Sequence, residues 1–417
     1  MNLEIKKQDN PSLIIFICLL PILAFLSKSS SDITLSFMGL FFVFYSIKHQ
    51  QYQWLAWPWV KAMLAFITLA MLSSVFSPFP QAAFTQSFIY LRWPLAALAL
   101  VCLVLTTPER LRLFEKSALL FLVFIVADTV LQIIIGQDIL GHQSGNGRMT
   151  GPFSKRLVGV YSLKLFFFAF TSIYFSMTKN PKNIILLTLL ILVFNIFLLM
   201  TGERMVFIFG FLFFCLWFAA VFVTYKNLRK KIVILLTAGL SAFSGIVIFN
   251  HEIFVNRFMP FVEAMKNFSS TTYADIFRSA FELWQLSPWI GVGTRMYHDA
   301  CVLKLGYPTD EAYFQTVDGI CQHHPHNIYL EVLAQNGLLG LGLFLTMLFF
   351  IFKTIVNKTL LQRDFLMVTV LFSSLLVIFW PLTSSMSIFS NNYSGAVWLT
   401  IGWALARAKY LPQVNHT

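Results

Sequence analysis

Charged side chains are scarce in this sequence. Asp, Glu, Lys and Arg together make up 12% of its 417 residues, whereas hydrophobic residues make up 58%. So large an apolar share cannot be arranged around the core of one soluble protein. The composition therefore excludes an ordinary soluble enzyme or binding domain and predicts a protein that crosses a membrane several times.

Apolar runs account for most of the chain. A helix needs about 20 mostly apolar residues to cross a bilayer, and about twelve runs approach that length. They predict an all-α polytopic membrane protein. The predicted spans cover residues 12–27, 33–47, 57–77, 84–106, 117–135, 157–177, 184–200, 204–224, 232–249, 334–352, 364–380 and 391–407.

Acidic residues are the scarcer of the two charged kinds: 18 Asp and Glu stand against 30 Lys and Arg, a net charge of +12. The basic excess includes no low-complexity arm and no RNA-binding signature, so we expect no nucleic acid partner.

Lys and Arg accumulate in loops that are not translocated. With both termini in the cytoplasm, 17 of them fall in cytoplasmic segments and 10 in the opposite loops, which supports that orientation. No cleavage site follows the first apolar run, so we expect it to remain as an anchor.

One long polar stretch, residues 250–331, interrupts the apolar runs. It divides the chain into nine predicted spans in 1–249, a large loop in 250–331 and three spans in 332–417. The charge assignment places this loop outside, which in a bacterial inner membrane is the periplasm. A shorter exterior loop, residues 137–156, is rich in glycine. Such a loop can approach a ligand closely, or it can be a flexible connector.

The chain has only five cysteines. Cys18, Cys102 and Cys215 fall within predicted spans and are typical of small apolar packing residues. Cys301 and Cys321 both lie in the large loop, where an oxidising compartment would allow a disulfide between them. The alternative is a pair of free, buried thiols.

Histidines cluster where the large loop meets the next span, in the sequence H-H-P-H-N-I-Y-L-E that begins at His323. Imidazole takes up and releases protons near neutral pH, so the cluster favours either catalysis or metal binding. His324 and His326 could bind zinc together with Asp318, Cys321 or His323. The spacing fits no standard zinc signature, and we expect no metal and no cofactor.

Several further motifs follow one another along the chain. They are the Arg148 segment G-R-M-T-G-P-F, the Arg204 segment T-G-E-R, Arg278 before a tryptophan-containing helix, S-P-W-I-G-V-G from Ser287, and H-P-H-N-I-Y-L-E-V-L-A-Q-N-G-L-L-G from His324. In this order, within about twelve spans, they resemble the O-antigen ligase and polymerase superfamily. In that family a large periplasmic loop ends in an H-x-H-N motif, which is followed by a helix and a G-x-x-G turn.

The resemblance implies a GT-C-like membrane glycosyltransferase of the bacterial inner membrane, with its active site in the periplasm. No nucleotide sugar is available there, and the glycine-rich turn at Ser287–Arg295 lacks the lysine of a nucleotide-binding loop. The donor is therefore expected to be a glycan linked to undecaprenyl pyrophosphate. Guanidinium groups suit phosphate oxygens, so Arg148, Arg204 and Arg278 are candidate pyrophosphate ligands.

The resemblance also assigns the histidines. His326 is the candidate base that accepts the proton of the acceptor hydroxyl, and His324 is expected to orient His326 or the acceptor. The preferred function is that of an O-antigen ligase, with lipid A-core as acceptor and membrane lipids around it. A polymerase of carrier-linked units and a protein O-oligosaccharyltransferase are the alternatives. A transporter is disfavoured, because the sequence shows neither broken helices near the bilayer midplane nor internal repeats.

Each arginine also has a simpler interpretation. Arg204 could pair with Glu203 or extend from its helix end toward the membrane surface. Arg148 could be solvated, and Arg278 could bind lipid headgroups.

Overall fold

The computed structural model describes residues 10–411 except 146, 178–182, 250–254, 256–258, 260–261, 264–265, 306–320, 362–363 and 382–385. The described part is helical and contains no strand. Two isolated bridges, Gln137 with Gln143 and Gly145 with Arg148, occur in the glycine-rich loop. The structure is therefore that of an all-α protein.

The main helices follow the predicted spans closely. They are α1 (Pro11–Leu26), α2 (Lys28–Lys48), α3 (Pro58–Ser73), α4 (Pro80–Tyr90), α5 (Arg92–Ala99), α6 (Pro108–Ile135), α7 (Val158–Met177), α8 (Asn183–Met200), α9 (Arg204–Thr224), α10 (Arg229–Phe249), α12 (Thr272–Leu286), α13 (Tyr297–Leu305), α15 (Ile328–Leu361), α16 (Phe365–Ile378) and α17 (Asn391–Lys409). Among the described residues, 8 helical stretches are long and apolar enough to cross a membrane. The apolar helices α1 and α16 are shorter.

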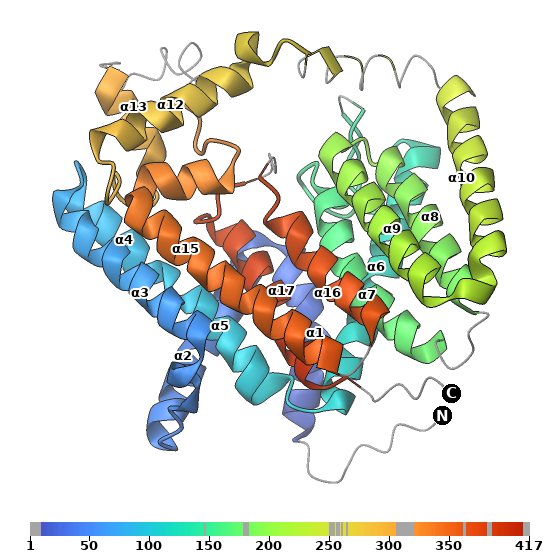
Figure 1. The fold of residues 1–417 in the computed structure, drawn as a ribbon, viewed down its shortest axis with the longest axis horizontal. Helices are drawn as coiled ribbons and strands as arrows, with labels where there is room; N and C mark the ends of the chain where they lie inside the picture. The colour runs from blue at the N-terminus through green and yellow to red at the C-terminus, as the bar shows by residue number, and fades with distance from the viewer. Residues whose placement is uncertain are drawn as a thin grey trace.

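The bundle has two distinct ends (Figure 1). Helices α12 and α13, which belong to the large loop, lie across one end, which we call the loop face. The start of α1 and the end of α17 lie at the opposite end, the terminal face. Because successive spans reverse direction, the starts of α7, α9, α15 and α17 all lie at the loop face.

Two arginines inside the bundle are held by carboxylates from other helices. Arg92 in α5 forms an ion pair with Asp32 in α2, with Nη2 and Oδ1 2.8 Å apart. Near the terminal face, Arg407 in α17 is paired with Glu115 in α6, and both side chains are buried. Such pairing is expected, because an unpaired charge within a membrane is costly.

Helix α15 is interrupted at Gly337, which has φ 66° and ψ −171°. The turn Pro288–Gly293 fits into the interruption. The amides of Val292 and Gly293 donate to the carbonyls of Ala334 and Gln335, at 3.0 and 2.9 Å.

Two amides of α15 beyond the interruption also bond to the inserted turn. Leu338 and Leu339 donate to the carbonyls of Pro288 and Trp289, at 2.9 and 3.1 Å. The break lies near the start of the predicted span 334–352, at the first glycine of the G-x-x-G turn, and not near the middle of that span. The helix tolerates the break because the inserted turn satisfies the backbone groups that the helix leaves unpaired.

Candidate functional site

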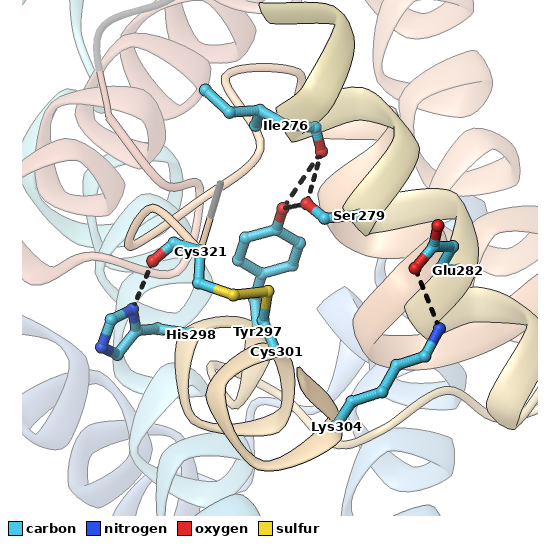
Figure 2. Close-up of a disulfide and its surroundings, with 8 residues drawn as sticks. All are labelled: Ile276, Ser279, Glu282, Tyr297, His298, Cys301, Lys304 and Cys321. Atoms are coloured by element: carbon cyan, nitrogen blue, oxygen red, sulfur yellow. Dashed lines mark hydrogen bonds and ion pairs between the residues drawn. A yellow bond between two sulfur atoms is a disulfide. The ribbon is translucent and has the colours of Figure 1, made fainter. Parts of the chain in front are cut away.

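The histidine segment is tied to the large loop by a covalent bond. Cys301 of α13 and Cys321 form a disulfide, with their α-carbons 5.6 Å apart. Nδ1 of His298 lies 2.7 Å from the carbonyl oxygen of Cys321, and the rings of His298 and His323 are 4.9 Å apart. Figure 2 shows that the disulfide and the hydrogen bond from His298 both join α13 to Cys321. The chain entering the H-P-H-N motif is thus fixed to α13.

Helix α13 is in turn held against α12 (Figure 2). The Tyr297 hydroxyl lies 2.7 Å from Ser279 Oγ and donates to the carbonyl of Ile276 at 3.2 Å. Lys304 forms an ion pair with Glu282 at 3.1 Å. The disulfide and the Tyr297 ring are buried among Ala280, Leu283 and Ala334, so the loop helices and the start of α15 share one small core.

Asn327 starts α15 and sets the direction of the motif. Its Oδ1 accepts hydrogen bonds from the amides of Tyr329 and Leu330, at 2.9 and 3.1 Å, which is the N-cap arrangement that asparagine favours. The residue before it, His326, adopts φ +50°, a left-handed conformation that is uncommon for a residue other than glycine. Uncommon backbone conformations of this kind occur often at functional sites.

The two motif histidines contact one another. Their ring centroids are 4.4 Å apart, and the His326 ring also lies 5.7 Å from the ring of Tyr273 in α12. Burial, followed by the charges of His326 and His323, lowers the pKa of His324 to about 3. Nε2 of His324 is buried and has no hydrogen-bond partner among the described residues. His324 is therefore a neutral imidazole in contact with His326, and both residues are half-buried.

Glu331, one turn into α15, anchors this helix to the segment before α17. Its carboxylate accepts hydrogen bonds from the hydroxyl of Ser387 and from the amide of Ile388, the latter at 3.1 Å. Gln335 also donates to it, at 3.3 Å. The sequence prediction missed Glu331 and Asn327 as supports of the histidines. The rule that asparagine caps helices could have identified the second.

Arg148 and Arg204 belong to a second cluster, in which Arg148 acts on the carboxyl of Glu203 and Arg204 follows Glu203 in the chain. The Met149 amide donates to the carbonyl of Thr201 at 3.1 Å, which joins the glycine-rich loop to the T-G-E-R turn. Oε1 of Glu203 accepts the amide of Gly159 at 2.7 Å, and the amide of Val160 also bonds to this carboxylate. Glu203 therefore caps α7 through hydrogen bonds to two of its amides, and its carboxylate also interacts electrostatically with Arg148.

Burial raises the pKa of Glu203 to about 7, even though these amides and the charges of Arg148 and Lys164 act in the opposite direction. Glu203 is 8% exposed, whereas Arg148 is exposed and Arg204 is partly buried. The cluster thus combines accessible guanidinium groups with a carboxyl that changes its charge near neutral pH.

The segment before α17 connects the two clusters. Ile388, which bonds to Glu331, also accepts a hydrogen bond from Ser394 Oγ at 2.6 Å. Tyr393, which precedes Ser394, lies against Lys164 of α7, with the Nζ of Lys164 4.2 Å from the Tyr393 ring centroid. The histidine cluster and the arginine cluster therefore lie on the same face and are joined through α17.

Arg278 lies outside both clusters. It lies on the exposed side of α12, where its side chain is 63% exposed and pairs with Asp275 at 3.3 Å. Arg295 is a further cation that sequence reasoning assigned no role. It adopts φ +63°, its amide bonds to Gln335, and its Nη1 donates to Gln86 at 2.9 Å.

Among the described residues, no three His, Cys, Asp or Glu side chains are grouped so that they could hold a metal ion. Cys321 is in a disulfide and is not a thiolate ligand. Asp318, the carboxylate considered for such a site, lies outside the described residues.

Comparison with known proteins agrees with the motifs. Residues 186–345 match a family model described as O-antigen ligase. The match covers Arg204, Arg278 and the histidine motif, whereas Arg148 and α7 precede it. No curated protein matches the chain. The resemblance to the O-antigen ligase and polymerase superfamily is therefore confirmed over residues 186–345, the part of this multi-pass membrane protein that carries most of its motifs.

Proposed function

We propose that the protein is an O-antigen ligase of the bacterial inner membrane. It would transfer a preassembled glycan from undecaprenyl pyrophosphate to a sugar hydroxyl of lipid A-core, with both termini in the cytoplasm and the loop face in the periplasm. One observation carries the proposal: an exposed arginine, a buried carboxyl and a pair of histidines share a single face of an O-antigen ligase family protein. About twelve spans, with residues 250–331 as the principal exterior loop, are part of the same proposal.

The arginines supply the binding of the donor. Arg148 acts on the Glu203 carboxyl at the start of α7, and Arg204 follows Glu203 directly. The N-terminal amides of α7 also attract negative charge. Guanidinium groups stay protonated and bind phosphate oxygens through several donors. They would hold the pyrophosphate and stabilise the charge that develops as it leaves. Arg278 would approach from the opposite side, on α12.

The histidines act on the acceptor. The acceptor oxygen bonds to the anomeric carbon as the bond from that carbon to the pyrophosphate oxygen breaks, and the leaving oxygen keeps the electron pair. The hydroxyl proton passes to His326. His324, which burial keeps neutral, orients the His326 ring across their 4.4 Å contact. No step requires a metal ion.

The ligase is preferred to the polymerase because the chain has one dominant exterior loop, residues 250–331. A polymerase would use the same donor chemistry with a carrier-linked glycan as acceptor. A protein O-oligosaccharyltransferase would use a hydroxyl of a protein side chain. The three functions differ in the acceptor alone, so the acceptor has to be tested.

Purified protein in nanodiscs, incubated with an undecaprenyl-pyrophosphate-linked glycan, distinguishes these acceptors. We expect glycosylated lipid A-core when lipid A-core and carrier-linked glycan are offered together. We also expect the rate to be unchanged in excess chelator. Product on the carrier alone would establish the polymerase, and loss of transfer in chelator that zinc restores would contradict the metal-free mechanism.

A further inference from the structure

Lys164 differs from the other basic residues inside the bundle. Arg92 and Arg407 each pair with a carboxylate. Lys164 is only 6% exposed, yet among the described residues its Nζ forms no hydrogen bond and no ion pair. Its Nζ lies instead over the face of Tyr393, 4.2 Å from the ring centroid. An ammonium group removed from water without an acceptor is costly, so its position suggests an anion that binds from outside.

The nearby carboxyl of Glu203 does not compensate for this charge fully. Glu203 interacts with Lys164 electrostatically, but its carboxylate bonds to the amides of Gly159 and Val160. Since the pKa of Glu203 is about 7, the group is only partly ionised at neutral pH. Among the described residues, Lys164 therefore has an aromatic ring that holds it in place and no permanent counter-ion.

The position of Lys164 suits a ligand that enters from the loop face. It lies six residues along α7 from Val158, which is about 9 Å deeper at 1.5 Å per residue. Arg148 acts on the same Glu203 carboxyl from the glycine-rich loop, and Arg204 follows Glu203 directly. Two cations from two segments thus act on one carboxyl, Arg148 from the loop and Lys164 from α7, and Arg204 starts α9 directly after that carboxyl's residue.

We propose that Lys164 is a ligand of the donor's pyrophosphate, lying below Arg148 and Arg204 and reached from the loop face. The proposal rests on the proposed function, because it takes a lipid-linked pyrophosphate as the donor. The pyrophosphate gains a negative charge when the glycosidic bond breaks. A third cation therefore stabilises the leaving group as well as the bound donor. Until the donor arrives, the partly ionised Glu203 carboxyl offsets only part of the charge of Lys164.

Binding of farnesyl pyrophosphate to the full chain in phosphatidylcholine nanodiscs tests this proposal. The probe has a short isoprenyl chain and a pyrophosphate with a free end, as the carrier has once the glycan has left, and farnesol provides the same chain without the anion. We expect Lys164→Met to weaken farnesyl pyrophosphate binding by about 10- to 100-fold, as for the loss of a charge-assisted contact. Farnesol binding is expected to stay unchanged, and Lys164→Arg to recover part of the affinity.

The matched control is Lys304→Met, which removes a lysine from the same face that is paired with Glu282 and lies outside the site. It is expected to bind both probes as the unaltered protein does. Equal loss of farnesyl pyrophosphate and farnesol binding in Lys164→Met would show a structural role and overturn the proposal. A change of less than about 2-fold in the affinity of Lys164→Met for farnesyl pyrophosphate would also overturn the proposal, because the loss of a charge-assisted contact predicts a change of at least about 10-fold.

Two further arms identify the source of the anion. Inorganic pyrophosphate is expected to compete weakly, because it lacks the chain. Phosphatidylglycerol that competes as well as farnesyl pyrophosphate would make Lys164 a general headgroup ligand, contrary to the proposal. If the unaltered protein binds the probe with this dependence on Lys164 but transfers no glycan to any acceptor, the proposed function fails while the anion site stands.

Discussion

Replacing His326 with alanine is expected to lower the rate of glycan transfer by about 10²- to 10⁴-fold, the usual contribution of a positioned general base. His326 precedes the Asn327 cap, and its ring lies between those of Tyr273 and His324. Without an imidazole there, the acceptor hydroxyl would have to lose its proton to water. The loss is expected in kcat, because the arginines still bind the donor. Single-turnover transfer in nanodiscs measures it.

His323→Ala is the matched control. His323 belongs to the same motif, is exposed and contacts His298, so its removal should change the rate little. An Asn at position 326 adds a second comparison, because asparagine tolerates φ +50° better than alanine does but cannot accept the proton. Transfer by His326→Asn at the rate of the unaltered protein would rule out His326 as the base.

Replacing Gly337 with alanine is expected to disrupt the histidine site without touching a histidine. Gly337 has φ +66°, and a Cβ there would overlap the backbone of Trp289 and Ile290. The backbone conformation alone costs about 1–3 kcal/mol for a residue other than glycine. The overlap also separates Pro288–Gly293 from α15, so four inter-segment hydrogen bonds are weakened. We expect a lower melting temperature and a large loss of transfer.

Gly342→Ala on the same helix separates this effect from a general one. A Cβ at Gly342 would meet no described atom within 4 Å beyond its own stretch of helix, and the φ of Gly342 is not positive. An alanine there should be neutral or stabilise the helix by about 0.5–1 kcal/mol. Faster hydrogen exchange at the amides of Val292 and Leu338 in Gly337→Ala, but not in Gly342→Ala, would show that the turn has separated from α15. If the two variants exchange and melt alike, the interlocked backbone does not hold the site.

Much of the fold could be predicted from hydrophobicity. Each of the twelve predicted spans coincides with helical structure, because lipid imposes a length and composition that a sequence reveals directly. One difference is the run 84–106, which the structure divides into α4, α5 and a following π-helical turn. Pro94, close to that division, lacks the amide that a continuous helix would use.

The site could be predicted less completely, because its residues meet through contacts distant in sequence. Gly337 was recognised within a motif, but its contact with Trp289 depends on how the loop folds back onto α15. Glu203 was treated as a partner of Arg204, whereas its bonds are to the amides of α7. Lys164 lies within the predicted span 157–177, and only the structure shows that it faces Tyr393.

A cryo-EM structure of the protein with an undecaprenyl-pyrophosphate-linked glycan bound would test the central claim most directly, because the claim is geometric. We expect pyrophosphate oxygens within about 3 Å of the guanidinium groups of Arg148 and Arg204. His326 should then face the anomeric carbon, with room for one hydroxyl between them. A pyrophosphate bound at the terminal face, or an anomeric carbon that one acceptor hydroxyl could not connect to the His326 ring, would contradict the account.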